Sequence, residues 1–188
     1  MLPSLIVRSC PQSQDLFLNR SCAHDRRRAE RVTKHSGRCV LANSPAFKRI
    51  NLCVSDLEKS LSIYRDILGF TVDYQKDSKE DSYSYPVFKF PKEAKMRFAT
   101  LNTPSQERTL ALTEVKGIDL PRMPLPHMAA AVINCPSFDE VMEKVEAAGL
   151  DIISPQVLPD LDGTPKGREG AFIDPDGHLI VIYVLNDR

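Results

Sequence analysis

The same short pattern of residues occurs twice between residues 47 and 185 of this chain. In each copy an alternating apolar strand is followed by a serine, a glutamate three residues later, a helical stripe of apolar residues and a glycine. Ser55 and Gly69 flank the first helix, and Ser137 and Gly149 flank the second. Serine with glutamate is typical of a helix start, and glycine accepts the left-handed conformation that ends a helix. Because the elements recur in the same order, we expect two related modules.

Further strand signals complete each copy. In the first copy we expect strand 47–54, helix 56–68 and strands near 70–77, 96–101 and 109–115. In the second we expect strand 127–133, helix 138–148 and strands 150–154, 169–173 and 178–185, with a long loop before 169. Pro175 and Gly177 predict a type I turn before the last strand. The predicted fold is α+β, with two tandem βαβββ modules whose curved mixed sheets form a cup-shaped cleft.

Composition separates the modules from an N-terminal extension. Residues 1–44 are basic and lack periodicity, which predicts a disordered extension; an organelle-targeting or nucleic-acid-binding arm is the alternative. The modules should occupy residues 45–116 and 127–186, with the proline-containing stretch 117–126 as a linker. Together they should form one domain over residues 45–186.

Charge and cysteine content limit the partners. The chain has 25 basic and 25 acidic side chains. Eight basic and three acidic side chains lie in the extension, so 17 basic and 22 acidic side chains remain in the rest of the chain. A mildly acidic body argues against a nucleic-acid partner. Five cysteines without a pairing pattern predict free thiols in a reducing compartment. No apolar run is long enough to cross a bilayer and no signal-peptide pattern is present, so we expect a cytoplasmic protein without a membrane partner.

Alternation along the strands predicts which side chains face away from the helices. The expected helix-facing residues are Ile50, Leu52 and Val54 in the first copy and Met128, Ala130 and Val132 in the second. The other face should then carry these polar residues among small apolar ones: Arg49, Asn51, Thr113, His127 and Tyr183. An apolar cup with a few convergent polar groups is typical of a small-molecule site, although a sandwich core or a subunit interface would give the same pattern.

These patterns resemble the vicinal oxygen chelate superfamily, which includes glyoxalase I, extradiol dioxygenases, methylmalonyl-CoA epimerase, fosfomycin resistance enzymes and bleomycin-sequestering proteins. The resemblance covers residues 47–185. In the first copy it is carried by Val54, Asp56, Leu57, Ser60, Tyr64, Leu68, Gly69 and Phe70. In the second copy it is carried by His127, Val132, Ala148, Gly149, Arg168, Phe172, Asp174, Pro175, Asp176, Gly177, His178 and Tyr183. The resemblance implies the cup-shaped fold and a homodimer.

The resemblance also implies where a metal would bind. Metal-dependent members take ligands from the first and fourth strands of each copy, and these positions correspond here to Arg49, Ala111, His127 and Val181. Only the histidine is a metal ligand, whereas catalytic metal sites normally have three or more protein ligands. We therefore expect no metal cofactor, with a divalent ion held by a loop or a second subunit as the alternative.

The remaining polar residues suggest roles in binding or catalysis. Arg49 would favour an anionic or carbonyl-bearing ligand, and His127 is the candidate general acid or base. Arg168, expected on the long loop, could cover a bound ligand. Three further residues are expected to hydrogen-bond the ligand: Asn51, Thr113 and Tyr183.

Two functions follow from these assignments. The first is a metal-free protein, similar to the bleomycin-resistance branch, that binds a small organic ligand in its cup. The second is a glyoxalase-like lyase or isomerase, or an extradiol-dioxygenase-like enzyme, with an atypical metal site. In that enzyme Arg49 would stabilise negative charge while His127 moves a proton. The missing ligand set slightly favours binding.

Overall fold

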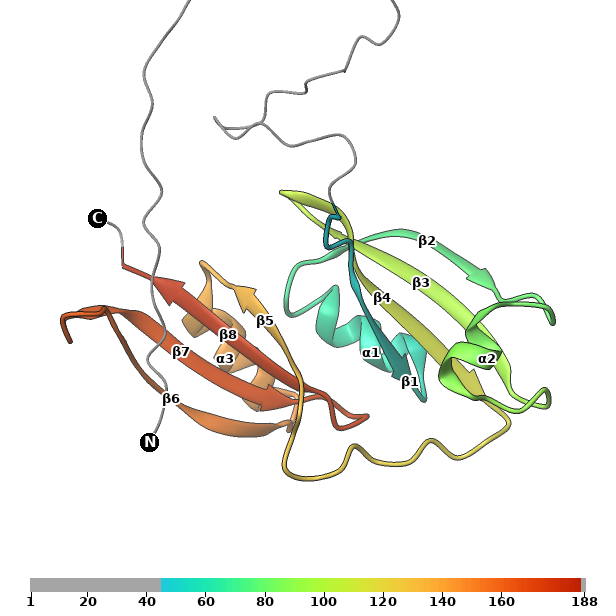
Figure 1. Cartoon of the computed structure of the whole chain (residues 1–188). Coiled ribbons are helices and arrows are strands. Elements are labelled where there is room, and N and C mark those ends of the chain that lie inside the picture. Colours follow the sequence, from blue (N-terminus) through green and yellow to red (C-terminus); the bar gives the residue numbers. More distant parts are fainter. Residues whose placement is uncertain (1–44, 187–188) are drawn as a thin grey trace, which may run out of the picture. The chain divides into compact units, whose positions relative to one another are not determined.

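The computed structural model describes residues 45–186, which form two four-stranded mixed sheets, each with its own helix (Figure 1). The strand order is β1-β4-β3-β2 in sheet 1 and β5-β8-β7-β6 in sheet 2. In each sheet the first and last strands of the module are parallel neighbours, and the other pairs are antiparallel. The predicted α+β fold with two tandem modules is confirmed. The predicted extension, residues 1–44, lies outside the described residues.

The first module contains one helix that the sequence did not predict. Its elements are β1 (Ile50–Val54), α1 (Leu57–Tyr64), β2 (Thr71–Asp77), α2 (Ser84–Phe88), β3 (Lys95–Thr103) and β4 (Gln106–Lys116). Helix α2 places Tyr85 against Met96 of β3 and Val115 of β4, in a small core separate from the main one. Met96 and Val115 are paired residues of the face opposite α1. Helix α2 therefore covers one end of that face.

The second module has longer hairpin strands than expected. Its elements are β5 (Ala130–Asn134), α3 (Phe138–Ala147), β6 (Asp151–Pro159), β7 (Pro165–Ile173) and β8 (Leu179–Leu185). The long loop predicted before residue 169 is wrong, because β6 continues past Pro155 and β7 already starts at Pro165. Strand β6 is an edge strand with an irregular register between Ile153 and Gln156, which is where a sheet tolerates proline. Arg168 consequently lies within β7 rather than on a loop.

The helices begin differently from the predicted capping pattern. Asp56, not Ser55, caps α1, and its carboxylate accepts a hydrogen bond from the backbone of Lys59 at 3.0 Å. Ser137 occupies the cap position of α3, but its side chain makes no capping hydrogen bond. The helix-ending glycines are confirmed by their positive φ angles: 77° at Gly69 and 69° at Gly149.

Strand β5 exposes the opposite face from the one predicted. Ala131 and Ile133 pack on the main core, and Ala131 pairs with the fully buried Ile180. Val132 is 64 % exposed. The reason is that three consecutive alanines carry no alternation that could distinguish the two faces. The predicted helix-facing set of Met128, Ala130 and Val132 is therefore wrong. Met128 precedes β5, and Ala130 and Val132 lie on the face of β5 away from the core.

The turn at residues 174–178, here called the inter-module turn, connects the two modules. It joins them through hydrogen bonds of 2.8–2.9 Å between Tyr64 and Asp174, Ser55 and Asp176, and Cys53 and His178. The predicted tight turn is confirmed by a bond from the amide of Gly177 to the carbonyl of Asp174. Burial raises the pKa of the Asp174 carboxyl, and burial beside that carboxylate raises the pKa of Tyr64.

The main core also spans both modules. Residues of α1, including Leu57, Leu61 and Tyr64, belong to the same buried cluster as Phe138 and Phe172 of the second module. In residues 45–186, no helix has the length and apolar character needed to cross a membrane. Cys53 and Cys135 are free thiols, as predicted, and the other three cysteines lie outside this range.

Candidate functional site

The open face of sheet 1, defined as the face opposite α1, is polar. Strand pairing places four side chains in a row across it: Asn51, Ala111, Thr100 and Tyr74. In the next row the Thr113 hydroxyl donates a hydrogen bond to Oδ1 of Asn51 at 2.9 Å. Thr113 is fully buried and Asn51 is only partly buried. Thr113 therefore orients Asn51, whose amide nitrogen remains available as a donor.

The open face of sheet 2, defined as the face opposite α3, is apolar. The equivalent row consists of Val132, Val181, Ala171 and Ile153. Val132 is 64 % and Ile153 is 50 % exposed. A shallow pocket of about 230 Å³ includes Ile153, Ala171 and Val181 and ends at a hydrogen-bonded pair of Gln156 and Glu169. This face can accommodate an apolar group.

Comparison with known proteins identifies the family of the chain. Residues 46–182 match the model of the Glyoxalase/Bleomycin resistance protein/Dioxygenase superfamily. The chain belongs to this superfamily. No curated protein sequence matches it.

Solved structures of superfamily members share the fold. A glyoxalase family protein from Bacillus cereus has a TM-score of 0.61 at 13 % identity, covering 79 % of this chain and 100 % of its own. A glyoxylase/bleomycin resistance protein/dioxygenase domain from Frankia has a TM-score of 0.54 at 20 % identity, covering 76 % and 99 %. The trypanothione-dependent glyoxalase I of Leishmania major has a TM-score of 0.50 at 20 % identity, covering 76 % and 87 %. At these identities the likeness shows the fold alone.

The two modules can be compared at the position of Arg49, one of the four positions that the superfamily resemblance assigns to metal ligands. Arg49 lies seven residues before Asp56, the cap of α1. The same interval before Ser137, the cap of α3, leads to Ala130 and not to His127.

Strand pairing relates the same residues of the two modules. Asn51, two residues after Arg49, pairs with Ala111, and Val132, two residues after Ala130, pairs with Val181. By strand pairing, Ala130 and Val181 of the second module are therefore equivalent to Arg49 and Ala111 of the first. None of these side chains can coordinate a metal, because a guanidinium is always protonated and the others are hydrocarbons. Across residues 45–186, His, Cys, Asp and Glu side chains form no group of three that could hold a metal ion. The residues present do not fit the metal of the metal-dependent members.

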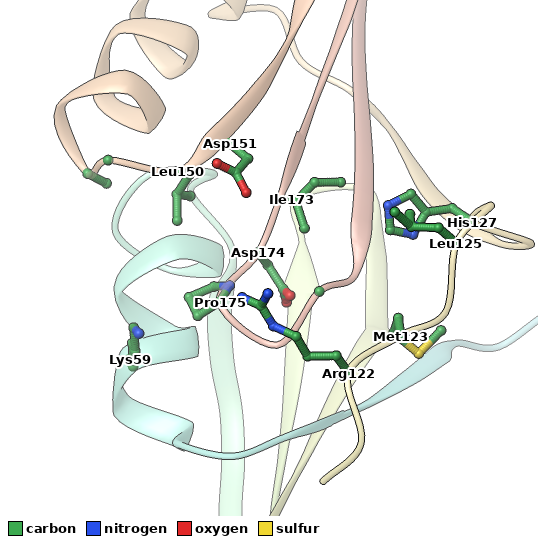
Figure 2. A pocket seen from close by; sticks show the side chains of 13 residues that line it. Lys59, Arg122, Met123, Leu125, His127, Leu150, Asp151, Ile173, Asp174 and Pro175 are labelled. Carbon is green, nitrogen blue, oxygen red and sulfur yellow. The ribbon is translucent and has the colours of Figure 1, made fainter.

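His127 lies outside the strands. It belongs to the segment between β4 and β5, residues 117–129, which we call the connector. The histidine lines a cavity of about 450 Å³ beside the inter-module turn, together with Lys59 and Arg122 (Figure 2). The structure therefore places His127 at this cavity and not in the row that contains Asn51.

Arg168 lies on the helix side of sheet 2. Its guanidinium is 2.6 Å from the Asp139 carboxylate of α3 and 5.1 Å from the centre of the Phe138 ring. The hydrogen bond between the two lowers the pKa of Asp139 and raises that of Arg168. In the first module Arg97 of β3 pairs in the same way with Glu58 of α1, at 3.5 Å. The repeated sequence could have revealed this role, because Arg97 and Arg168 occupy equivalent strand positions.

Arg49 and Tyr183, the remaining predicted site residues, lie at or in strands of the two sheets. Arg49 directly precedes β1 and is partly buried. Tyr183 lies in β8, paired with Glu169 and Asn134, and shares its face with Val181. The sequence did not identify Tyr74, which ends the polar row of sheet 1 and whose ring lies 5.4 Å from the Arg108 guanidinium. Finding Tyr74 required the register of β2, which the sequence does not specify.

Proposed function

We propose that this superfamily member binds a small organic anion at its open faces, without a metal ion at the four equivalent positions of the two modules. The observation that carries the proposal is the set of residues at those positions, an arginine and three hydrocarbon side chains. An arginine beside an apolar surface favours a carboxylate, a phosphate or a polarised carbonyl group through paired hydrogen bonds.

The difference between the two faces indicates the character of the ligand. Sheet 1 supplies Arg49 and the Asn51 amide that Thr113 orients, so it would hold the polar end of the ligand. Sheet 2 supplies the row from Val132 to Ile153, which would contact an apolar body. The proposed ligand is therefore amphiphilic, with a charged or carbonyl-bearing end joined to a hydrocarbon or aromatic portion.

The test begins with elemental analysis and a thermal-shift panel on the purified full-length protein. The panel should include benzoate, octanoate and phenyl phosphate as amphiphilic anions, with benzyl alcohol and octanol as uncharged counterparts. We expect substoichiometric metal and a higher melting temperature with at least one anion. Near-stoichiometric zinc, nickel, iron or manganese would overturn the metal-free proposal.

Two variants separate ligand binding from general effects of charge. Arg49→Ala should abolish the anion-dependent stabilisation. Arg65→Ala is the matched control, because Arg65 is an exposed arginine of the same module paired with Asp66 at 2.6 Å. Equal loss of stabilisation in both variants would contradict a role for Arg49.

An enzyme of the lyase, isomerase or dioxygenase type is the alternative function. It would need a proton-transferring group or metal ligands near Arg49, and the position of His127 in the connector does not favour this. Metal that is lost in His127→Ala would support the enzyme. The predicted homodimer remains a prediction that analytical ultracentrifugation can test.

A further inference from the structure

The cavity lined by His127, here called the connector cavity, is built from three parts of the chain. The connector forms one side, the inter-module turn the floor, and the residues following α3 the other side, with Lys59 of α1 at the edge. Figure 2 shows Arg122 reaching from the connector toward Asp174 and Pro175, with Lys59 on the other side of the turn. The volume of about 450 Å³ is sufficient for a small molecule.

Three basic and two acidic side chains line the connector cavity. Lys59, Arg122 and His127 line it, and no carboxylate of residues 45–186 forms an ion pair with any of them. Asp174 is 3 % exposed, and its two oxygens accept hydrogen bonds from the Tyr64 hydroxyl and from two backbone amides of the turn. Asp151 is the other carboxylate in the lining. Lys59 and Arg122 are exposed, and among residues 45–186 their side chains have no carboxylate partner.

The duplicated fold contains an equivalent cavity for comparison. A space of about 690 Å³ is lined by the residues following α1, by the turn at 103–106 and by α3. Its lysine, Lys144, pairs with Glu140 at 2.6 Å, and its Asp66 pairs with Arg65 at 2.6 Å. Glu140 lies three residues after the cap of α3, the position that Lys59 occupies in α1. Within the described residues, the lysine of one cavity is paired with a carboxylate, whereas Lys59 and Arg122 of the other cavity have no ion-pair partner.

One residue of the connector lies near the inter-module turn. A Cβ atom added to Gly177 would lie 3.5 Å from the backbone nitrogen of Met123, so the connector passes near the turn with room for about one carbon atom between them. Met123, the residue that follows Arg122, is therefore at the turn.

We propose that the connector cavity is a second binding site, distinct from the open faces, that takes a phosphate or carboxylate group through Arg122, Lys59 and His127. The arginine would form paired hydrogen bonds with two oxygens of the group, and the lysine would contribute a point charge from the opposite edge. The apolar lining, which includes Met123, Leu125 and Leu150, would contact the remainder of the ligand.

The test is an NMR titration of the full-length, ¹⁵N-labelled protein with inorganic phosphate, and separately with acetate, at constant ionic strength maintained with sodium chloride. The amide signals of Gly149, Asp151 and Gly177 should shift and saturate. Saturation with phosphate alone identifies a phosphate site, and saturation with both anions identifies a general oxyanion site. No saturable shift with either anion would overturn the proposal.

Variants establish which groups hold the anion. Arg122→Ala should weaken binding by about tenfold, the effect of losing one charge-assisted contact. Lys59→Glu, which introduces the residue type of the equivalent cavity, should abolish saturation. Lys144→Ala is the control in the equivalent cavity and should leave binding unchanged. Unchanged affinity in both Arg122→Ala and Lys59→Glu would overturn the proposal.

Arg49→Ala separates this site from the one proposed on the open faces. If the connector cavity binds the anion independently, the shifts at Gly149, Asp151 and Gly177 should persist in this variant. Their loss would show that the anion binds near Arg49 and would overturn the second site, while leaving the first proposal intact.

Discussion

The two modules share a strand order, but the turn between the last two strands makes different hydrogen bonds in each module. In the second module the inter-module turn bonds to Tyr64, Ser55 and Cys53 of the first. In the first module, among residues 45–186, the turn at 103–106 bonds only to itself and to the carbonyl of Lys48 in the same module. Thr103 and Pro104 stand there in the places of Asp174 and Pro175. The duplicated halves therefore have different structural roles, which a comparison of their elements alone would not show.

The largest expected effect comes from removing the central acceptor of the inter-module turn. Asp174→Ala leaves the Tyr64 hydroxyl and two backbone amides without acceptors in a buried site, and should lower the free energy of unfolding by about 3 kcal/mol. Thr103→Ala, at the equivalent place in the first module, should cost less than about 1 kcal/mol. Urea unfolding followed by circular dichroism measures both. Equal costs would contradict the proposed difference between the turns.

A second comparison concerns the two equivalent arginines. Arg97 lies 3.2 Å from the buried carboxylate of Glu114, whereas Arg168 pairs with the exposed Asp139. Arg97→Ala would leave a buried charge partly uncompensated and should cost about 2 kcal/mol of unfolding free energy. Arg168→Ala should leave it nearly unchanged, because an exposed ion pair contributes little. The ranking would be wrong if thermal unfolding showed the larger loss for Arg168→Ala.

The smallest of these effects concerns the Tyr64 hydroxyl. Tyr64→Phe removes one donor to Asp174 and should cost about 1 kcal/mol in urea unfolding. That hydrogen bond lowers the pKa of Asp174 against the larger effect of burial, so the variant should raise this pKa further. Carboxyl ¹³C NMR measures the pKa directly. An unchanged pKa would argue against the hydrogen bond.

The raised pKa of Asp174 also predicts a pH dependence of stability. A carboxyl whose folded pKa lies above its unfolded value contributes stability below the unfolded pKa, about 4, and loses that contribution as the pH rises through the folded pKa. Wild-type stability should therefore fall relative to Asp174→Asn as the pH rises from about 4 toward neutrality. Urea unfolding of both proteins across this range tests the sign. A constant difference would show that Asp174 does not titrate in that range.

The sequence predicted those features that depend on local chemistry. Gly69, Gly149 and the turn ending at Gly177 adopt backbone conformations that their residue types favour, so their positions were correct. The orders of strands and helices followed from apolar periodicity. Helix α2 was missed because a five-residue helix containing a proline has too short a periodic pattern to identify.

The sequence predicted the site less well than the fold, because the site depends on register and on tertiary packing. Alanine fits either face of a strand, so Ala129 to Ala131 left the orientation of β5 undetermined. His127 was consequently assigned to a strand that begins only at Ala130. Lys59 and Arg122 come from segments far apart in the chain, and only the docking of the connector on the inter-module turn brings them to one cavity.

The inter-module turn has a further consequence for the way the halves recognise each other. Val145 occupies in α3 the position of Tyr64 in α1, eight residues after the helix cap, and it has no hydroxyl to offer a carboxylate. Two second halves brought together would leave the carboxyl of Asp174 buried without its tyrosine partner, and two first halves would lack the carboxyl altogether. The hydrogen bond between Tyr64 and Asp174 therefore forms only between unlike halves, and it would form in the same way if two copies of the chain exchanged halves.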